Sequence, residues 1–333
     1  ASRPLLEGVG LRCLAENGSF TPLEGGSDRR FTRIRGGVSS VVLLSQAPGW
    51  EIDSYIDVGR FLFDCGVPVP EILACDRERG LVLMEDVGDL HLDDALAEAP
   101  EETVRRRYEE AVSILVSLET GATDAMMRAG FLAKRRFDER TLLGETDYFV
   151  REFIEGLFRI DVPPEWERER QFLASSLAAE PPVFMHRDFQ SRNILIKDDR
   201  LRLVDFQTAH RGPALYDAAS LLKDAYHPLP ASLRRELVAQ LHGRLSERAS
   251  WRVGRFDDFY GRFILAGIQR NLQALAAFAK LGLRKGKRKF LDSIPPGLDL
   301  LEEGVGERGD LTALPSMIAA IRARIGDGLM KGL

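Results

Sequence analysis

Short hydrophobic runs bounded by polar residues or glycine characterise the first part of the chain. Residues 38–44 and 81–84 form two such runs, and their length is typical of buried strands. Between them, over residues 51–65, hydrophobic residues recur at the i, i+3, i+4 and i+7 spacing of one helix face. Gly66 suits the C-terminal end of that helix, because glycine adopts the left-handed conformation without strain. We therefore expect a β-rich region that contains one helix.

From about residue 90 onward the hydrophobic spacing is helical, with apolar faces over residues 104–118 and 264–278. This order of elements predicts an α+β protein with two lobes. We expect a small β-rich N-lobe over residues 1–87, which binds nucleotide, and a large, mostly helical C-lobe over residues 88–333. A ligand cleft is expected where two such lobes join.

Composition restricts the class of protein. Hydrophobic residues make up 44% of the 333 residues and charged residues 29%, which is ordinary for a globular protein. The net charge of -5 offers no general attraction to nucleic acid, and no hydrophobic run approaches the roughly 20 residues that span a bilayer. The first residues lack the layout of a signal peptide, and Cys13, Cys65 and Cys75 lack a disulfide or metal spacing. We expect a cytoplasmic protein that binds neither nucleic acid nor membrane.

One segment predicts specific chemistry. It begins with His186-Arg187-Asp188 and ends at Asn193, and it fits the pattern H-R-D-x-x-x-x-N of kinase catalytic loops. Asp205-Phe206 then stands where the magnesium-binding Asp-Phe pair follows in kinases. In this interpretation Asp188 is the base that accepts a hydroxyl proton. The pattern predicts transfer of the γ-phosphate of ATP to an alcohol, on a protein-kinase-like fold.

The residues between the two motifs support this interpretation. Residues 194–196 and 201–204 have the composition of strands, and a turn centred on residues 198–199 would join them as a hairpin. Asn193 and Asp205 would then leave the open end of the hairpin side by side. Because Mg²⁺ prefers oxygen ligands, Asn193 and Asp205 are the predicted metal ligands.

Three residues near this motif allow more than one role. We expect His186 to anchor the loop through hydrogen bonds to the backbone rather than to act in catalysis. Arg187 either faces a phosphate or neutralises nearby carboxylates. Asp217 either caps a helix that starts near Ala218 or holds the catalytic loop by hydrogen bonds, and the second role is favoured.

A glycine-containing segment precedes the first predicted strand. Gly25 and Gly26 let backbone N–H groups approach a phosphate closely, and Ser27, Arg29 and Arg30 add polar and cationic groups. We expect these residues to bind the phosphates of ATP. The alternative is an ordinary turn.

The strand predicted at 38–44 lacks the lysine with which kinases hold the α- and β-phosphates. Either another cation replaces it, with Arg29, Arg30 and Arg33 as candidates, or nucleotide binding is impaired. The strand at 81–84 runs into the connector between the lobes. There we expect the backbone from Glu85 to Val87 to bind the adenine edge.

Three sequence blocks resemble the aminoglycoside phosphotransferase superfamily. They are HRDFQSRNILI at 186–196, LVDFQTAHRGPALYDAASLL at 203–222 and IQRNLQALAAFAKLGLRKGKRKFLDSIP at 268–295. VPVPEIL at 67–73 and MEDVGD at 84–89 are similar as well, so the resemblance covers most of the chain. Within the superfamily, the chain looks most like the bacterial cell-wall sugar kinases that act on the anomeric hydroxyl of N-acetylmuramate and N-acetylglucosamine. The missing strand lysine is also typical of that branch.

The resemblance implies a kinase-like fold, Asp188 as the base, and Asn193 and Asp205 as Mg²⁺ ligands, with ATP as co-substrate. The leading expectation is phosphorylation of an amino sugar at its anomeric hydroxyl. One alternative is a kinase for another small alcohol, such as an aminoglycoside or a choline-like compound. The other is a nucleotide-binding regulatory protein without turnover, which the missing lysine motivates.

Several polar residues are candidates for the acceptor pocket. They are Arg192, Gln207, Arg211, Gln269 and Arg270. An arginine there would suit a lactate-type carboxylate through paired hydrogen bonds, whereas helix packing or surface placement is the alternative for each residue. The basic residues of segment 280–289 form a solvated loop or lie near an anionic substrate.

Overall fold

The computed structural model describes residues 3–23, 29–37 and 39–326 of the chain. The chain divides into two compact units. The first unit comprises residues 1–99, 186–188 and 192–209, and the second comprises residues 100–185, 189–191 and 210–333. The predicted division at residue 87 into two continuous lobes stays a prediction. Residues 186–188 and 192–209 of the catalytic segment belong to the first compact unit, and residues 189–191 belong to the second.

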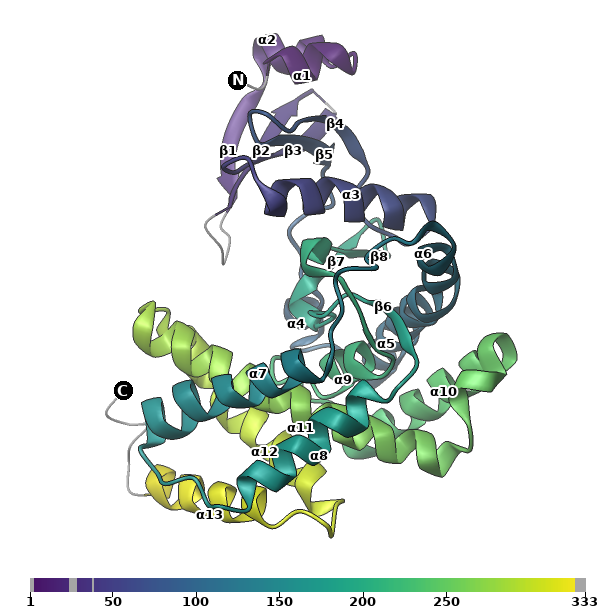
Figure 1. Ribbon diagram of the computed structural model, residues 1–333. Helices are drawn as coiled ribbons and strands as arrows, with labels where there is room; N and C mark the ends of the chain where they lie inside the picture. Colours follow the sequence, from purple (N-terminus) through teal and green to yellow (C-terminus); the bar gives the residue numbers. More distant parts are fainter. Residues whose placement is uncertain (1–2, 24–28, 38, 327–333) are drawn as a thin grey trace. The chain divides into compact units, whose positions relative to one another are not determined.

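The first unit contains a five-stranded antiparallel sheet with the order β1-β2-β3-β5-β4 (Figure 1). Its strands are β1 (Ser19–Leu23), β2 (Arg30–Gly36), β3 (Ser39–Ser45), β4 (Ile72–Asp76) and β5 (Leu81–Glu85), and its helices are α1 (Arg3–Gly8), α2 (Arg12–Asn17), α3 (Trp50–Asp64) and α4 (Leu92–Leu96). The two predicted strands and the predicted helix of this region are therefore confirmed as β3, β5 and α3.

Helices cover both faces of this sheet, which explains why β3 is hydrophobic along its whole middle part. Side chains alternate between the faces of a strand. Val41 and Leu43 lie in a core with Leu6 of α1 and Leu14 of α2. On the other face, Met84 of β5 pairs with Val42 and accepts a hydrogen bond of 3.2 Å from the Tyr55 hydroxyl of α3. Burial on both sides favours a continuous apolar run over an alternating one.

A hairpin also belongs to the first unit. It consists of β7 (Ile194–Lys197) and β8 (Arg200–Leu203), preceded by the short helix η3 (Ser191–Asn193) and followed by η4 (Phe206–Thr208). Asp198 and Asp199 at its turn have φ values of 51° and 59°. Two central residues with positive φ are typical of the tight turn whose twist matches that of the strands. The predicted hairpin and its centre are confirmed.

The second unit is mainly helical. Its helices are α5 (Glu101–Ser117), η1 (Leu118–Ala122), α6 (Thr123–Ala129), α7 (Glu139–Phe149), η2 (Val150–Phe158), α8 (Trp166–Ala178), α9 (Tyr216–Leu222), α10 (Ala231–Val253), α11 (Phe256–Ala279), η5 (Lys280–Arg284), η6 (Arg288–Ser293), α12 (Ile294–Gly306) and α13 (Ala313–Gly326), and its strands β6 (Pro182–Met185) and β9 (His210–Pro213) form a two-stranded sheet. α11 is buried along most of its length and packs against α7, α9 and α12. A sheet-containing unit and a helical unit confirm the α+β class.

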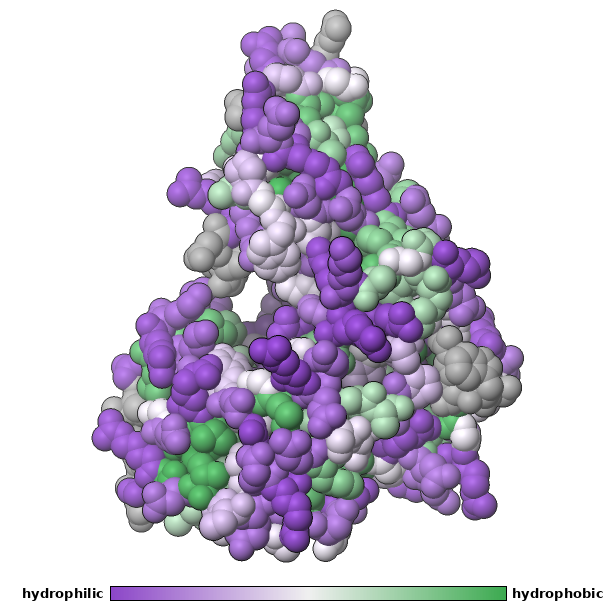
Figure 2. All heavy atoms as spheres, viewed as in Figure 1, coloured by the Kyte–Doolittle hydropathy of each residue, from purple (hydrophilic) through white to green (hydrophobic). Residues whose placement is uncertain are grey.

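The described part of the chain has no helix long and apolar enough to cross a membrane. On the face drawn in Figure 2, hydrophilic residues cover most of the surface and hydrophobic residues form separate small patches. Cys65 and Cys75 are half-buried free cysteines.

Candidate active site

The open end of the hairpin brings the two predicted metal ligands together. Ile194 pairs with Leu203, and the Val204 N–H donates to the Asn193 carbonyl oxygen at 2.9 Å. Asp205 follows immediately, and its φ of 66° turns the chain away from the strand into η4. Asn193 and Asp205 therefore leave neighbouring strands at the same end, as the hairpin geometry predicts.

The side-chain amide of Asn193 has a defined orientation. Its Nδ2 donates to the Asp188 carbonyl oxygen at 2.9 Å, which closes the loop between these two residues. The oxygen and nitrogen of an amide are separate branches of one planar carbon, so Oδ1 takes no part in this bond and can accept from or coordinate another partner. An amide oxygen beside the Asp205 carboxylate is a donor set that fits Mg²⁺ when nucleotide oxygens and water complete it. Within the described ranges no group of three His, Cys, Asp or Glu residues offers a competing all-protein metal site.

His186 ties this loop to the hairpin. The ring is fully buried, and its Nε2 lies 3.1 Å from the Val204 carbonyl oxygen while its Nδ1 lies 3.3 Å from the Asp188 backbone N–H. A neutral ring protonated on Nε2 satisfies both contacts, since it donates to the carbonyl and accepts from the amide. Burial lowers the pKa of His186, which favours this neutral form. This is the anchoring geometry that the sequence favours.

The Asp205 carboxylate has two side-chain partners in the same unit. Arg29 Nη2 lies 2.6 Å from Asp205 Oδ1, and Gln207 Nε2 donates to the same oxygen at 3.1 Å.

Gly25, Gly26 and Ser27, the predicted phosphate-binding residues, lie outside the described residues. Arg30, at the start of β2, is exposed.

Helix α3 holds the segment that follows Asp205. The ring of Phe206 is buried, and its centroid lies 4.8 Å from the centroid of the Tyr55 ring. The Ser54 hydroxyl donates to the Gln207 carbonyl oxygen. Gly59, one turn further along α3, leaves the space that the Phe206 ring occupies. Phe206 is thus fixed by packing, and Asp205 is held by the residue that follows it.

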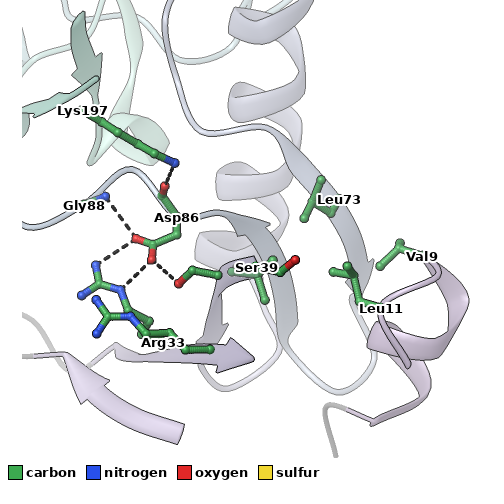
Figure 3. Close-up of a pocket in the computed structure, with 11 residues that line it drawn as sticks. Val9, Leu11, Arg33, Ser39, Leu73, Asp86, Gly88 and Lys197 are labelled. Atoms are coloured by element: carbon green, nitrogen blue, oxygen red, sulfur yellow. Dashed lines mark hydrogen bonds and ion pairs between the residues drawn. The ribbon is translucent and has the colours of Figure 1, made fainter. Parts of the chain in front are cut away.

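The connector after β5 carries a buried ion pair. Arg33 of β2 donates to both carboxylate oxygens of Asp86, at 2.7 and 2.9 Å (Figure 3). Arg33 also donates to Asp89. Burial alone raises the pKa of Asp86, but the hydrogen bonds from Arg33 and Ser40 outweigh it and the pKa is lowered. Arg33 and Asp86 line a pocket of about 590 Å³ where β3 begins and β5 ends.

The predicted adenine-binding residues lie on this connector. The Glu85 carboxylate accepts a hydrogen bond of 3.1 Å from Arg202 of the hairpin, and Val87 is buried. The Lys197 ammonium donates to the Asp86 carbonyl oxygen, as Figure 3 shows. The hairpin and the connector are therefore linked by two cations.

In the second unit, Asp224 holds the middle of the catalytic loop. Its Oδ2 accepts hydrogen bonds from the Ser191 backbone N–H at 2.8 Å and from the Ser191 hydroxyl at 2.6 Å. Its Oδ1 accepts from the Tyr226 N–H at 2.9 Å. Asp224 is buried, and burial raises its pKa above the ordinary range. In the chain, Ser191 lies between Asp188 and Asn193.

The acceptor candidates occupy different environments. Gln269 is fully buried, and its Nε2 donates to the Leu142 carbonyl oxygen and to Glu145 of α7. Arg270 is also buried and donates to Ser220, to Gln273 and, at 3.0 Å, to Gln190 of the catalytic loop. Gln269 thus contacts a neighbouring helix and Arg270 contacts the catalytic loop, and a role of either residue in acceptor binding stays a prediction.

The other candidates are more varied. Arg192 donates to Asp93 at 2.9 Å, and 38% of its side chain remains exposed. Gln207 is bonded to Asp205 as described above. Arg211 is half-buried on β9, where its backbone bonds to Arg135. Asp217 is buried in the first turn of α9, which begins at Tyr216.

The basic segment after α11 is partly paired. Arg284 lies 2.9 Å from Glu152, and the ammonium of Lys280 lies 5.5 Å from the centre of the Tyr148 ring. Lys285 and Lys289 are exposed. This environment is mostly that of a solvated cationic surface.

Three features of the site were not expected from the sequence. Asp224 follows Lys223 at the end of a helix and belongs to no motif, so nothing marks it as the partner of Ser191. The Arg33–Asp86 pair joins residues that are 53 positions apart. The role of Gly59 has a signal, because a glycine inside a helix is unfavourable and often marks a close contact.

Comparisons with known proteins agree with this geometry. A model of the phosphotransferase enzyme family matches residues 19–255. An N-acetylmuramate/N-acetylglucosamine kinase of Pseudomonas aeruginosa is 29% identical over 304 residues, which cover 89% of this chain and 86% of that protein. A protein of the same name from Neisseria meningitidis serogroup B is 30% identical over 289 residues, which cover 85% of this chain and 84% of that protein.

Solved structures share the fold. A choline/ethanolamine kinase family protein from Mesorhizobium loti has a TM-score of 0.62 at 18% identity, and the match covers 97% of this chain and 98% of that one. An ADP-bound aminoglycoside phosphotransferase has a TM-score of 0.53 at 12% identity, over 90% of this chain and 98% of that one. These similarities confirm the kinase-like fold. Since the family model also matches more than half of its length, this chain belongs to the phosphotransferase enzyme family.

Proposed function

We propose that this protein transfers the γ-phosphate of ATP to the anomeric hydroxyl of an amino sugar, N-acetylmuramate or N-acetylglucosamine. The observation that carries the proposal is the catalytic segment. Asp188, Asn193 and Asp205 stand on one hydrogen-bonded loop and hairpin, and relatives with the name of that activity match over most of the chain. Such a reaction consumes intracellular ATP, so we place the protein in the cytoplasm.

Each residue has a chemical task in this proposal. Asp188 accepts the proton of the attacking hydroxyl, and Asn193 and Asp205 hold Mg²⁺ through their side-chain oxygens. The bound metal neutralises charge that develops on the phosphates. His186 and Asp224 fix the backbone on either side of Asp188 in the chain, so that the base keeps its position without a change in its own chemistry.

The nature of the hydroxyl supports an anomeric acceptor. An anomeric hydroxyl is more acidic than an ordinary alcohol, so a carboxylate such as Asp188 accepts its proton more readily. Phosphoryl transfer needs little covalent chemistry from the protein, and positioning with charge stabilisation supplies most of the rate. The site needs no further acid or base for this acceptor.

A second candidate is a kinase for another small alcohol, since the similar solved structures include a choline/ethanolamine kinase family protein and an aminoglycoside phosphotransferase. Aminoglycosides are polycations and bind where acidic side chains gather. The predicted acceptor segments of this chain instead carry Arg192, Arg211, Arg284, Lys285 and Lys287. These charges favour an anionic or neutral sugar.

An assay of ADP release over a panel of acceptors tests the proposal. The panel contains both amino sugars, their 1-O-methyl glycosides, choline and several aminoglycosides. We expect turnover with a free amino sugar, no turnover with its methyl glycoside, and loss of turnover in Asp188→Asn. Efficient phosphorylation of an aminoglycoside or choline, with neither amino sugar active, would replace the acceptor while the kinase activity stands.

A further inference from the structure

Kinases of this fold hold the nucleotide phosphates with a strand lysine, and this chain has none on β3. The strand from Ser39 to Ser45 contains only serine, valine and leucine. The acidic residues of α3 are not arranged to orient a lysine either. Asp53 and Asp57 pair with Arg77, and α3 meets the Asp205 segment through Ser54, Tyr55 and Gly59, none of which is acidic.

Three arginines near the start of the sheet were candidates for the missing cation, and the structure separates them. Arg33 is committed to Asp86 and Asp89 on the connector. Arg30 is exposed at the start of β2. Arg29 alone of the three contacts Asp205, with Nη2 2.6 Å from Oδ1.

The environment of Arg29 suits a functional cation. Only 13% of its side chain is exposed, whereas 36% of the Asp205 side chain is exposed. The buried Tyr55 lies next to both charges, and its pKa is raised by burial, lowered by Arg29 and raised by Asp205. An ion pair that is largely shielded from water interacts more strongly than a surface pair. Arg29 also adjoins the glycine-containing segment in the chain.

We infer that Arg29 takes the place of the strand lysine as the cation that binds the ATP phosphates. In this structure it pairs with Asp205 and holds that carboxylate in position. When the metal-bound nucleotide enters, Arg29 leaves Oδ1 and donates to phosphate oxygens, for which the planar guanidinium is well suited. Arg29 and a divalent cation therefore compete for Asp205 in the free protein. This inference rests on the proposed kinase function.

Binding measurements on three variants test the inference without any acceptor. Arg29→Met removes the charge and keeps most of the side-chain length, Arg29→Lys keeps a point charge, and Arg79→Ala removes an exposed arginine of the same unit as a control. Calorimetry measures the affinity for Mg-ATP, and the electron paramagnetic resonance of Mn²⁺ measures binding of the metal alone.

We expect Arg29→Met to bind Mg-ATP about 10- to 100-fold more weakly, the range for loss of a charged hydrogen bond. The same variant should bind Mn²⁺ alone several-fold more tightly, because the competing guanidinium is gone. Arg29→Lys should recover part of the nucleotide affinity, and Arg79→Ala should behave as the wild type. A thermal unfolding scan of each variant checks that the fold is intact.

Mg-ATP affinity within twofold of the wild type in Arg29→Met would overturn the inference. Equal weakening in Arg29→Met and Arg29→Lys would overturn it too, because the charge would then have no effect. These results are independent of the acceptor. A protein that binds Mg-ATP through Arg29 but phosphorylates no amino sugar would disprove the proposed function and leave the role of Arg29 standing.

Discussion

Gly59 of α3 and Phe206 of η4 lie too close for any larger residue at position 59. A Cβ atom there would be 2.9 Å from Cε2 of Phe206 and 2.8 Å from Cδ1 of Ile72. Phe206 directly follows Asp205, so this contact determines where the candidate metal ligand can lie. α3 and the segment that contains Asp205 can therefore pack this closely only because residue 59 has no side chain.

We predict that Gly59→Ala destabilises the protein by about 1–3 kcal/mol, the usual cost of overpacking. Helix propensity acts in the opposite direction, since alanine is favoured over glycine by about 1 kcal/mol inside a helix. The displaced ring should also weaken Mg-ATP binding. Chemical denaturation and calorimetry measure the two effects.

Gly144→Ala on α7 is the matched control. A Cβ atom at position 144 would have no neighbour within 4 Å, so only helix propensity acts there. We expect this substitution to raise the free energy of unfolding slightly. A Gly59→Ala variant that gains stability to the same extent as Gly144→Ala would show that the Phe206 contact is not restrictive.

A second prediction concerns the support of the catalytic loop. Asp224→Ala removes the acceptor of both Ser191 hydrogen bonds and should lower kcat about 100-fold, as expected for a small displacement of a catalytic group. Mg-ATP affinity should change little, because Asp224 touches neither candidate metal ligand. Steady-state kinetics and calorimetry together separate the two parameters.

Ser191→Ala provides the comparison for this experiment. It removes the hydroxyl but keeps the backbone N–H that also donates to Asp224. We expect a smaller fall in kcat than in Asp224→Ala. If Asp224→Ala keeps wild-type kcat, the carboxylate does not position the loop. Equal loss in the two variants would mean that it acts through the Ser191 hydroxyl alone.

The parts of the site that follow from the sequence are local in the chain. Asn193 and Asp205 were predicted to lie together because a hairpin with a turn at residues 198–199 forces the residues before and after it to meet. The two strands and the tight turn that place Asn193 near Asp205 can each be recognised from a few consecutive residues of the sequence. The same holds for α3, whose hydrophobic spacing marks its buried face.

Long-range pairs leave no such pattern. Arg29 and Asp205 are 176 positions apart, and from the sequence Arg29, Arg30 and Arg33 are equal candidates for the cation that replaces the strand lysine. Polar residues of α11 show a second limit of the sequence, which does not tell a buried structural residue from a ligand-binding one. Gln269 is polar but fully buried, since its amide bonds to Leu142 and Glu145. A buried polar residue with a partner and a polar residue in a ligand pocket look alike in the sequence.

A third prediction concerns the start of α13. Glu169 of α8 is buried and accepts hydrogen bonds from the backbone N–H groups of Thr312, Ala313 and Leu314. These are N–H groups that a helix cannot satisfy internally. We expect Glu169→Ala to lower the free energy of unfolding by about 2 kcal/mol, the upper range for loss of a cap.

Glu167→Ala on the same helix serves as its control, since the exposed Glu167 bonds only to Arg170 and Gln171 of its own helix in the described contacts. Denaturant titration of both variants gives the comparison. Equal stability of Glu169→Ala and Glu167→Ala would contradict the capping role. Such an outcome would mean that water replaces the carboxylate at no cost.

The last prediction concerns Lys223, whose side chain is fully buried and whose Nζ lies 3.7 Å from Glu303 Oε1. Burial lowers the pKa of Lys223 more than Glu303 raises it. The folded state therefore binds fewer protons than the unfolded state between this lowered pKa and the ordinary value of about 10.4, and wild-type stability rises with pH across that window. Lys223→Met should be equal or more stable at neutral pH, by up to about 3 kcal/mol, since Arg234 still pairs with Glu303. The difference in free energy of unfolding between Lys223→Met and the wild type should become smaller as the pH approaches 10. Denaturation of both proteins across this range measures the difference, and a Lys223→Met variant that is less stable than the wild type at neutral pH would contradict the expected cost of burying the charge.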